Sequence, residues 1–113
     1  MNYNNIVMPD YGHSILCTIS SILKYYNVET EHKTSEKLDK ILNEKEYKNV
    51  IFLILDGLGE HILNKISKDG ILNKNKIDCV TSVYPSTTTA ALTTYYSGKP
   101  PYETRVDRVV TVF

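Results

Sequence analysis

Two short stretches of the sequence carry side chains that are suited to phosphate and metal chemistry. Asp56 follows the uninterrupted apolar run 50–55 and is followed at once by Gly57. A serine and three threonines at 86–89 lie between a proline and a stretch with a helical pattern. A carboxylate is a ligand for Zn²⁺ or Mg²⁺. A hydroxyl at a helix start lies among free amide groups, which favour an alkoxide or a phosphoryl oxygen.

Each stretch also has a purely structural interpretation. Asp56-Gly57 is typical of a turn that ends a strand. A Ser or Thr hydroxyl in the cluster 86–89 is typical of an N-cap, which accepts a hydrogen bond from a free amide in the first helical turn. The two stretches become more informative together, because the ends of neighbouring parallel strands meet at one edge of a sheet. A carboxylate and a metal-activated hydroxyl at one edge would suit phosphoryl transfer.

The first 48 residues are expected to be helical. Apolar side chains recur every three or four positions between about Tyr11 and Tyr26, which predicts an amphipathic helix with Asp10 as its cap. A second, shorter helix is predicted over Ser35 to Glu44, after a polar loop.

The pattern changes at Asn49. The run 49–57 is apolar on both faces and rich in β-branched residues, as is typical of a central strand in a parallel sheet. A helix over 58–70, a strand over 76–85 and a helix ending at Gly98 are predicted to follow. The alternation of strands and helices indicates the α/β class.

Composition narrows the classes of partner and compartment. The 113 residues are enough for one domain, and thirteen basic residues balance thirteen acidic ones. A net charge of zero argues against nucleic acid and anionic membranes as partners. Cys17 and Cys79 form no disulfide framework or CxxC motif, the start has no secretory pattern, and no apolar run is long enough to span a bilayer. A cytoplasmic protein is expected, with no prediction of its oligomeric state.

The order of these motifs resembles a known family. NVIFLILDGLGE, followed by VTSVYPSTTTAALTTYYSGKPPYET, is similar to the start of the alkaline phosphatase superfamily, specifically its type I phosphodiesterase/nucleotide pyrophosphatase branch. The shared features are an aliphatic strand ending in Asp-Gly, an aromatic-Pro-Ser/Thr-x-Thr segment, and a helix that reaches a Ser/Thr-Gly-x-x-Pro turn. The resemblance spans roughly Asn49 to Thr104.

The resemblance implies a fold, a reaction and two site residues. The fold would be the N-terminal part of an alkaline-phosphatase-like sheet with flanking helices, preceded by two helices. The reaction would be hydrolysis of a phosphate ester or nucleotide with two Zn²⁺ ions per site. By position, Asp56 corresponds to the first metal-ligating aspartate, and Thr88 corresponds to the threonine that is both nucleophile and metal ligand. Thr87 is the alternative if the register is shifted by one.

The chain departs from the family after this region. The family's other aspartate and histidine ligands lie further downstream than this sequence extends, and Asp56 and Thr88 cannot complete a tetrahedral zinc site alone. His13, His32 and His61 are expected to be solvated or packing residues rather than replacements. The isolated chain is therefore expected to be inactive. The competing interpretation is a small non-enzymatic domain that binds phosphate or a protein through the helix start at Thr88.

The tail 105–113 differs from what the relatives carry. Permitted codons for RVDRVVTVF, read one base later, encode Gly-Trp-Ile-Gly-Trp-Ser-Leu-Tyr, which resembles the relatives' continuation. We expect a single-base frameshift near Thr104, and the alternative is a genuine short protein with a β-rich tail. The predicted organisation is a helical segment 1–48, a partial α/β domain 49–104 and an aberrant tail 105–113.

Overall fold

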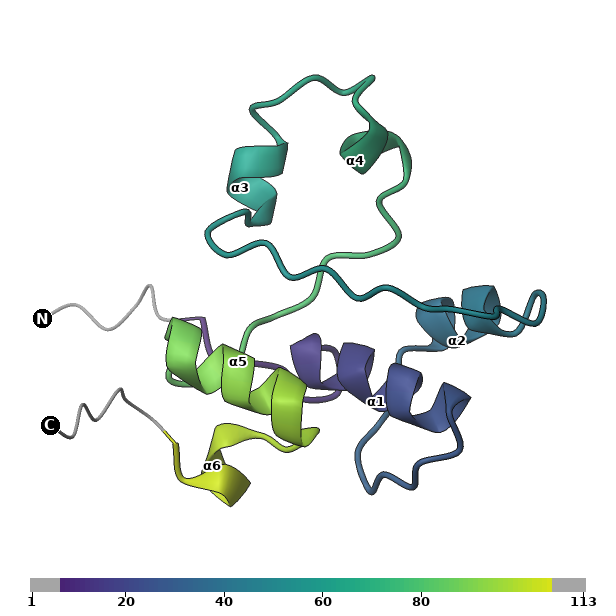
Figure 1. The fold of residues 1–113 in the computed structure, drawn as a ribbon. Helices are drawn as coiled ribbons and strands as arrows, with labels where there is room; N and C mark the ends of the chain where they lie inside the picture. Colours follow the sequence, from purple (N-terminus) through teal and green to yellow (C-terminus); the bar gives the residue numbers. More distant parts are fainter. Residues whose placement is uncertain (1–6, 107–113) are drawn as a thin grey trace, which may run out of the picture.

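The computed structural model describes residues 7–106 and contains helices as its regular elements over that range (Figure 1). Their bounds are α1 Ile15–Tyr25, α2 Glu36–Leu42, α3 Glu60–Leu63, α4 Ile71–Lys74, α5 Thr88–Ser97 and α6 Pro101–Thr104. α1 contacts α2 and α5, and α6 contacts α5. α3 and α4 form a separate lobe at the top of Figure 1, joined to the other helices by two long connections.

The predicted helix in the first segment is confirmed as α1, but its predicted cap is wrong. Ser14 is the N-cap, because its Oγ accepts a hydrogen bond from the Leu16 amide at 3.2 Å. Asp10 instead accepts a hydrogen bond from the Gly12 amide at 2.9 Å, within the turn that precedes the helix. Leu16 and Cys17 are buried and form part of a small core.

The second predicted helix is confirmed as α2, and hydroxyl groups connect it to α1. Ser35 is its N-cap, with Oγ accepting from the Leu38 amide at 3.4 Å. The Ser35 amide donates to Ser21 Oγ on α1 at 2.8 Å. The Tyr25 hydroxyl accepts from the Tyr47 amide at 2.9 Å, so the chain after α2 also returns to α1. These contacts position the start of the apolar run at Val50.

The helix predicted to end at Gly98 is confirmed as α5, which packs on α1. Ala90 and Thr94 are fully buried on its inner face. Gly98 ends the helix with φ of +66°, a conformation that glycine adopts without strain. A Cβ at Gly98 would lie 2.7 Å from Leu23 Cδ1, so a side chain there would also displace the end of the Leu23 side chain.

The predicted α/β fold with an alkaline-phosphatase-like sheet is wrong. Within residues 7–106 the β-type pairing is a single parallel bridge between Ser14 and Thr81. The run 50–55 is not paired, and no backbone hydrogen bond joins it to another described residue. The second predicted strand, 76–85, contacts the turn before α1 instead: the Ile15 amide donates to the Thr81 carbonyl at 3.0 Å. An apolar β-branched run signals a preference for extended backbone, but a sheet also needs a neighbouring strand.

The helix predicted over 58–70 is also shorter than expected. α3 covers only Glu60–Leu63, and Gly70 is the N-cap of α4 rather than the end of a long helix. No side chain of α3 or α4 is buried. An apolar groove of about 410 Å³ separates this lobe and the run 50–52 from α1 and α2. The apolar side chains around it therefore remain loosely packed.

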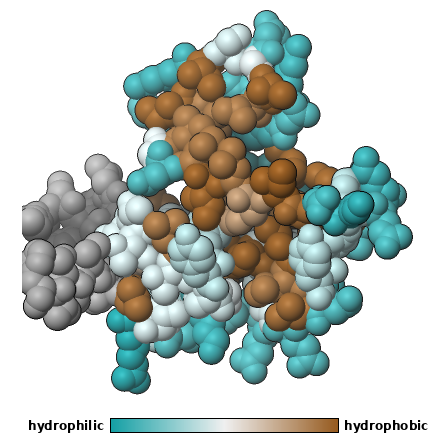
Figure 2. All heavy atoms as spheres, viewed as in Figure 1, coloured by the Kyte–Doolittle hydropathy of each residue, from teal (hydrophilic) through white to brown (hydrophobic). Residues whose placement is uncertain are grey.

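The exposed surface of this region is strongly apolar. Figure 2 shows hydrophobic side chains in a continuous band from the α3–α4 lobe down to the other helices. No helix between residues 7 and 106 has both the length and the apolar character needed to cross a bilayer. Most of the tail 105–113, whose origin the sequence analysis questions, lies outside the described residues.

Candidate functional site

Asp56 and Thr88 lie side by side, although they are 32 residues apart in the sequence. Thr88 Oγ1 is 3.5 Å from Asp56 Oδ1 and 3.4 Å from Asp56 Oδ2. Both side chains are exposed to solvent. The two residues predicted to form one site therefore come together even though the predicted sheet is absent from the described residues.

The separation of these oxygens suits two ligands of one zinc ion. A hydroxyl that donates to a carboxylate normally lies within about 3.0 Å of it, so 3.4–3.5 Å is long for a hydrogen bond. Two oxygens bound tetrahedrally to Zn²⁺ at about 2.05 Å are separated by about 3.4 Å. Octahedral Mg²⁺ brings adjacent oxygens to about 2.9 Å. Thr88 Oγ1 donates a long, bifurcated hydrogen bond to the Asp56 carboxylate across the distance of 3.4–3.5 Å, and the two side chains are close enough for one ion to bind both.

An aromatic contact and a glycine turn position Asp56. The Phe52 ring packs edge-on against Tyr95 of α5, with ring centroids 5.2 Å apart, and this contact brings the run 50–55 against the helix. Burial raises the pKa of the Tyr95 hydroxyl, as expected for a ring held inside such a contact. Gly57 then turns the chain with φ of +72°, and a Cβ there would meet no atom within 4 Å. Gly57 is thus required for its backbone conformation rather than for space.

The cap of α5 positions Thr88. Thr87 is the N-cap, with extended backbone and with Oγ1 accepting a hydrogen bond from the Ala90 amide at 3.2 Å. Thr88 is the first helical residue, so its side chain lies beside the amide groups at the start of α5 that have no partner within the helix. Two of the four hydroxyl residues at 86–89 therefore have different roles: Thr87 caps the helix, and Thr88 faces Asp56.

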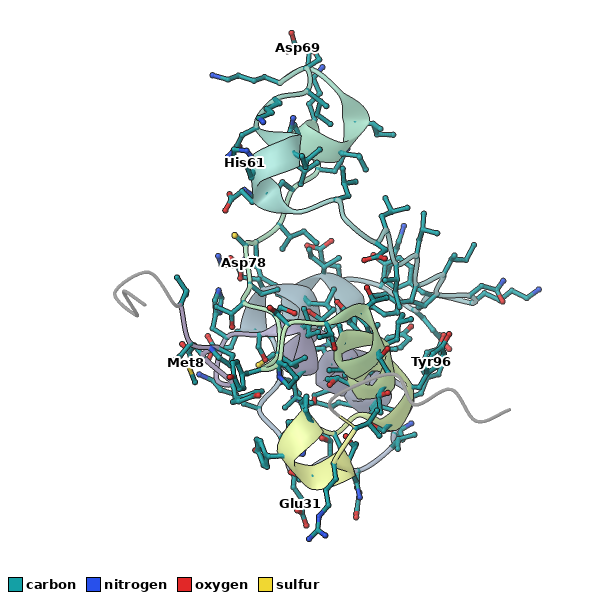
Figure 3. All side chains as sticks on the ribbon, turned by 90° about the vertical axis from the view of Figure 1, so that its left-hand side faces the viewer. Met8, Glu31, His61, Asp69, Asp78 and Tyr96 are labelled. Carbon is teal, nitrogen blue, oxygen red and sulfur yellow. The ribbon has the colours of Figure 1, made fainter. Side chains whose placement is uncertain are left out.

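Two oxygen ligands would make only half of a tetrahedral zinc site. Over residues 7–106 the structure brings together no group of three or more His, Cys, Asp or Glu side chains that would hold a metal ion. Two histidines face carboxylates elsewhere: His13 Nε2 lies 3.4 Å from Asp78 Oδ2, and His32 Nε2 lies 3.1 Å from Glu103 Oε1. His61 lies on the α3–α4 lobe, as Figure 3 shows.

A charged cluster that the sequence analysis did not anticipate lies between the lobe and the other helices. The Glu60 carboxylate accepts from the Cys79 thiol and pairs with Lys76. The bond from Cys79, followed by Lys76, lowers the pKa of Glu60, and the same bond to Glu60 raises the pKa of the Cys79 thiol. A raised pKa favours the protonated, weakly nucleophilic form of the Cys79 thiol.

The neighbouring Asp78 continues this cluster. Lys37 Nζ lies 2.8 Å from Asp78 Oδ1, and this hydrogen bond lowers the pKa of the Asp78 carboxyl. No sequence motif could have revealed these contacts, because the partners come from separate segments of the chain.

Comparison with protein-family models, with curated proteins and with solved structures finds no match to this chain.

Proposed function

We propose that Asp56 and Thr88 are a metal ligand and the nucleophile of a phosphoric-ester hydrolase. The observation that carries this proposal is that the Thr88 hydroxyl lies 3.4–3.5 Å from both oxygens of Asp56, close enough for one ion to bind both side chains. The resemblance of the surrounding motifs to phosphodiesterases and nucleotide pyrophosphatases supports the same reaction. The substrate would be a small phosphate ester or nucleotide.

In this proposal Thr88 attacks phosphorus. Its Oγ1 forms the new bond to phosphorus and its proton leaves to water, while the phosphorus–oxygen ester bond breaks and the leaving oxygen takes a proton from water and departs as the alcohol. The free amides at the start of α5 donate to the phosphoryl oxygens and stabilise their negative charge. A bound zinc ion would favour the alkoxide and neutralise charge on the transferring group. Water then hydrolyses the phosphothreonine and restores the Thr88 hydroxyl.

Residues 7–106 hold two ligands, so we expect zinc binding to be weak and turnover by this chain to be negligible. The family that the motifs resemble uses two zinc ions per site, which requires several further ligands. Asp56 and Thr88 would therefore be necessary for hydrolysis without being sufficient for it.

We also propose a cytoplasmic location. It rests on the two cysteines, which are both free thiols in the structure, with Cys17 buried and Cys79 exposed. An exposed free thiol suits a reducing compartment better than an oxidising one.

Phosphoryl transfer from a reactive donor tests the proposal without requiring turnover. The chain is incubated with Zn²⁺ and acetyl phosphate, and the peptide containing residues 86–89 is sequenced by tandem mass spectrometry. We expect phosphate on Thr88, dependent on Zn²⁺ and strongly reduced in Asp56→Asn. Asp69→Asn is the matched control, because Asp69 is an exposed carboxylate on the α3–α4 lobe (Figure 3).

Three results would contradict the proposal. Phosphate on Thr87 would assign the nucleophile to the neighbouring residue. Equal labelling of all four hydroxyls at 86–89, with or without Zn²⁺, would show that no hydroxyl is activated. Calorimetric binding of inorganic phosphate without metal, unchanged in Asp56→Asn, would favour a phosphate-binding domain instead.

A further inference from the structure

The run 50–55 has the form of a β-strand that lacks a partner within the described residues. Exposure alternates along it: Ile51 is 91% and Leu53 is 72% exposed, whereas Phe52 is 40% and Ile54 is 36% exposed. Alternation with a period of two is the pattern of extended backbone with one covered face. Its backbone amides and carbonyls make no hydrogen bond to another described residue. This stretch therefore presents both apolar side chains and free backbone groups.

Such a segment pairs readily with another strand. An exposed edge offers a row of donors and acceptors, and natural proteins usually protect it with charges, proline or a covering element. The run 50–55 contains no charged residue, no proline and no glycine. Six apolar residues, four of which are Val, Ile or Phe with high β-propensity, are the composition of strands that associate between chains. Figure 2 shows that the hydrophobic band around this region faces outward.

The charges that flank the run indicate which strand would fit. Lys48 lies at a bend two residues before the run and Asp56 lies in the turn that directly follows it, and both are exposed. In an antiparallel pair of two identical strands centred on Phe52, Lys48 of each chain lies opposite Asp56 of the other. A parallel pair in register would place like charges opposite each other at both ends, which is unfavourable. The flanking charges thus select the antiparallel arrangement of two copies.

We propose that a second copy of this chain covers the run 50–55, forming a symmetric dimer through antiparallel strands centred on Phe52. In this register Ile51 lies opposite Leu53 of the second copy, so the most exposed apolar side chains cover each other. Phe52 lies on the other face, where it keeps its contact with Tyr95. A two-fold arrangement makes every contact twice and closes at two copies. The proposal shares Asp56 with the proposed metal site, but its test measures dimer dissociation and requires neither zinc nor phosphorylation of Thr88.

Charge reversal tests both the surface and the register. Dimer dissociation is measured by sedimentation velocity over a range of concentrations for wild type, Lys48→Glu, Asp56→Lys and the double variant. Each single change replaces two opposite-charge pairs by two like-charge pairs, so we expect dissociation constants about tenfold higher than wild type. The double variant restores both pairs and should dimerise within about threefold of wild type.

A second set of variants tests the apolar face. Leu53→Asp places a charge at the centre of the proposed interface and should abolish the dimer. Ile71→Asp is the matched control, because Ile71 is 78% exposed on α4, outside the run, and should leave dissociation unchanged. Far-UV circular dichroism verifies that each variant keeps its helices.

Different results would overturn the dimer, its antiparallel register or the use of the run 50–55. A monomer at all concentrations would overturn the proposal, as would growth of open fibrils in place of a closed dimer. A double charge reversal that dimerises no better than the single variants would overturn the antiparallel register. Equal effects of the substitutions at 53 and 71 would show that association does not use this run.

Discussion

Alanine substitutions at Thr87 and Thr88 should separate helix capping from chemistry. Thr87 Oγ1 accepts a hydrogen bond from the Ala90 amide at 3.2 Å, whereas Thr88 Oγ1 faces Asp56. Thr87→Ala should therefore lower the stability of the fold and leave the Asp56–Thr88 pair in place. Thr88→Ala should leave the stability of the fold nearly unchanged and remove the Asp56–Thr88 pair.

The magnitude follows from the geometry of the α5 start. Loss of a Ser or Thr N-cap typically costs about 1 kcal/mol, within a range of about 0.5–2 kcal/mol. The neighbouring Ala90 is fully buried, so the amide that loses its partner has little access to water and the cost should not fall below about 1 kcal/mol. Thr88 is an exposed first-turn residue, and its replacement should change stability by less than about 0.5 kcal/mol.

Urea unfolding followed by far-UV circular dichroism measures these differences. A loss of about 1 kcal/mol corresponds to a midpoint lower by about 0.5 M if m is about 2 kcal/mol/M. The measurement is made at low micromolar concentration, where self-association contributes least. Thr87→Ser and Thr88→Ser keep the hydroxyls and serve as matched controls, and each should behave like wild type.

Two results would refute this division of roles. If Thr88→Ala destabilised the chain as much as Thr87→Ala, then Thr88 would be part of the cap. If Thr87→Ala left stability unchanged and instead removed zinc-dependent phosphorylation, the register of the site would be shifted by one residue.

Two further predictions concern the contact between helices and the response to pH. Gly98→Ala should lower the free energy of unfolding by about 2–3 kcal/mol, because a side chain at positive φ is strained and its Cβ would lie 2.7 Å from Leu23 Cδ1. Gly57 has a similar φ but open space around it, so Gly57→Ala should lower the free energy of unfolding by only about 1 kcal/mol. Equal losses of stability in urea unfolding would contradict the close contact at Gly98. Burial raises the pKa of Asp39, but hydrogen bonds led by the one from Thr34 outweigh it and hold that pKa below the ordinary value of 3.8. The stabilisation by the ionised Asp39 carboxyl is therefore present above about pH 4 and is lost as the pH falls through the lowered pKa. The stability difference between wild type and Asp39→Asn should consequently shrink in acid. A difference that grows in acid would contradict this prediction.

The helices were predictable because they depend on local chemistry. Apolar periodicity indicated α1 and α2, and the hydroxyl cluster before α5 indicated a cap, which the structure assigns to Thr87. The pairing of Asp56 with Thr88 was expected from neighbouring strand ends. It arises instead from the contact of Phe52 with Tyr95, which brings the end of the apolar run to the start of α5.

The absence of a sheet from residues 7–106 could not be predicted from local pattern, because a strand forms only where a neighbouring strand pairs with it. The run 50–55 has the composition and the alternation of a strand, yet no other described segment pairs with it. The cap of α1 was misassigned for a related reason. Asp10 and Ser14 are both competent caps, and the choice depends on the bridge between Ser14 and Thr81, which is 67 residues away.

Zinc titration followed by ¹⁵N–¹H NMR tests most directly whether Asp56 and Thr88 share a metal ion. We expect weak, saturable shifts of the Gly57, Thr88 and Thr89 amides, which lie next to the two oxygens proposed to bind the ion. These shifts should disappear in Asp56→Asn and persist in Asp69→Asn. Zinc shifts confined to the region of His13 and Cys79, or shifts near Thr88 that survive in Asp56→Asn, would contradict the account.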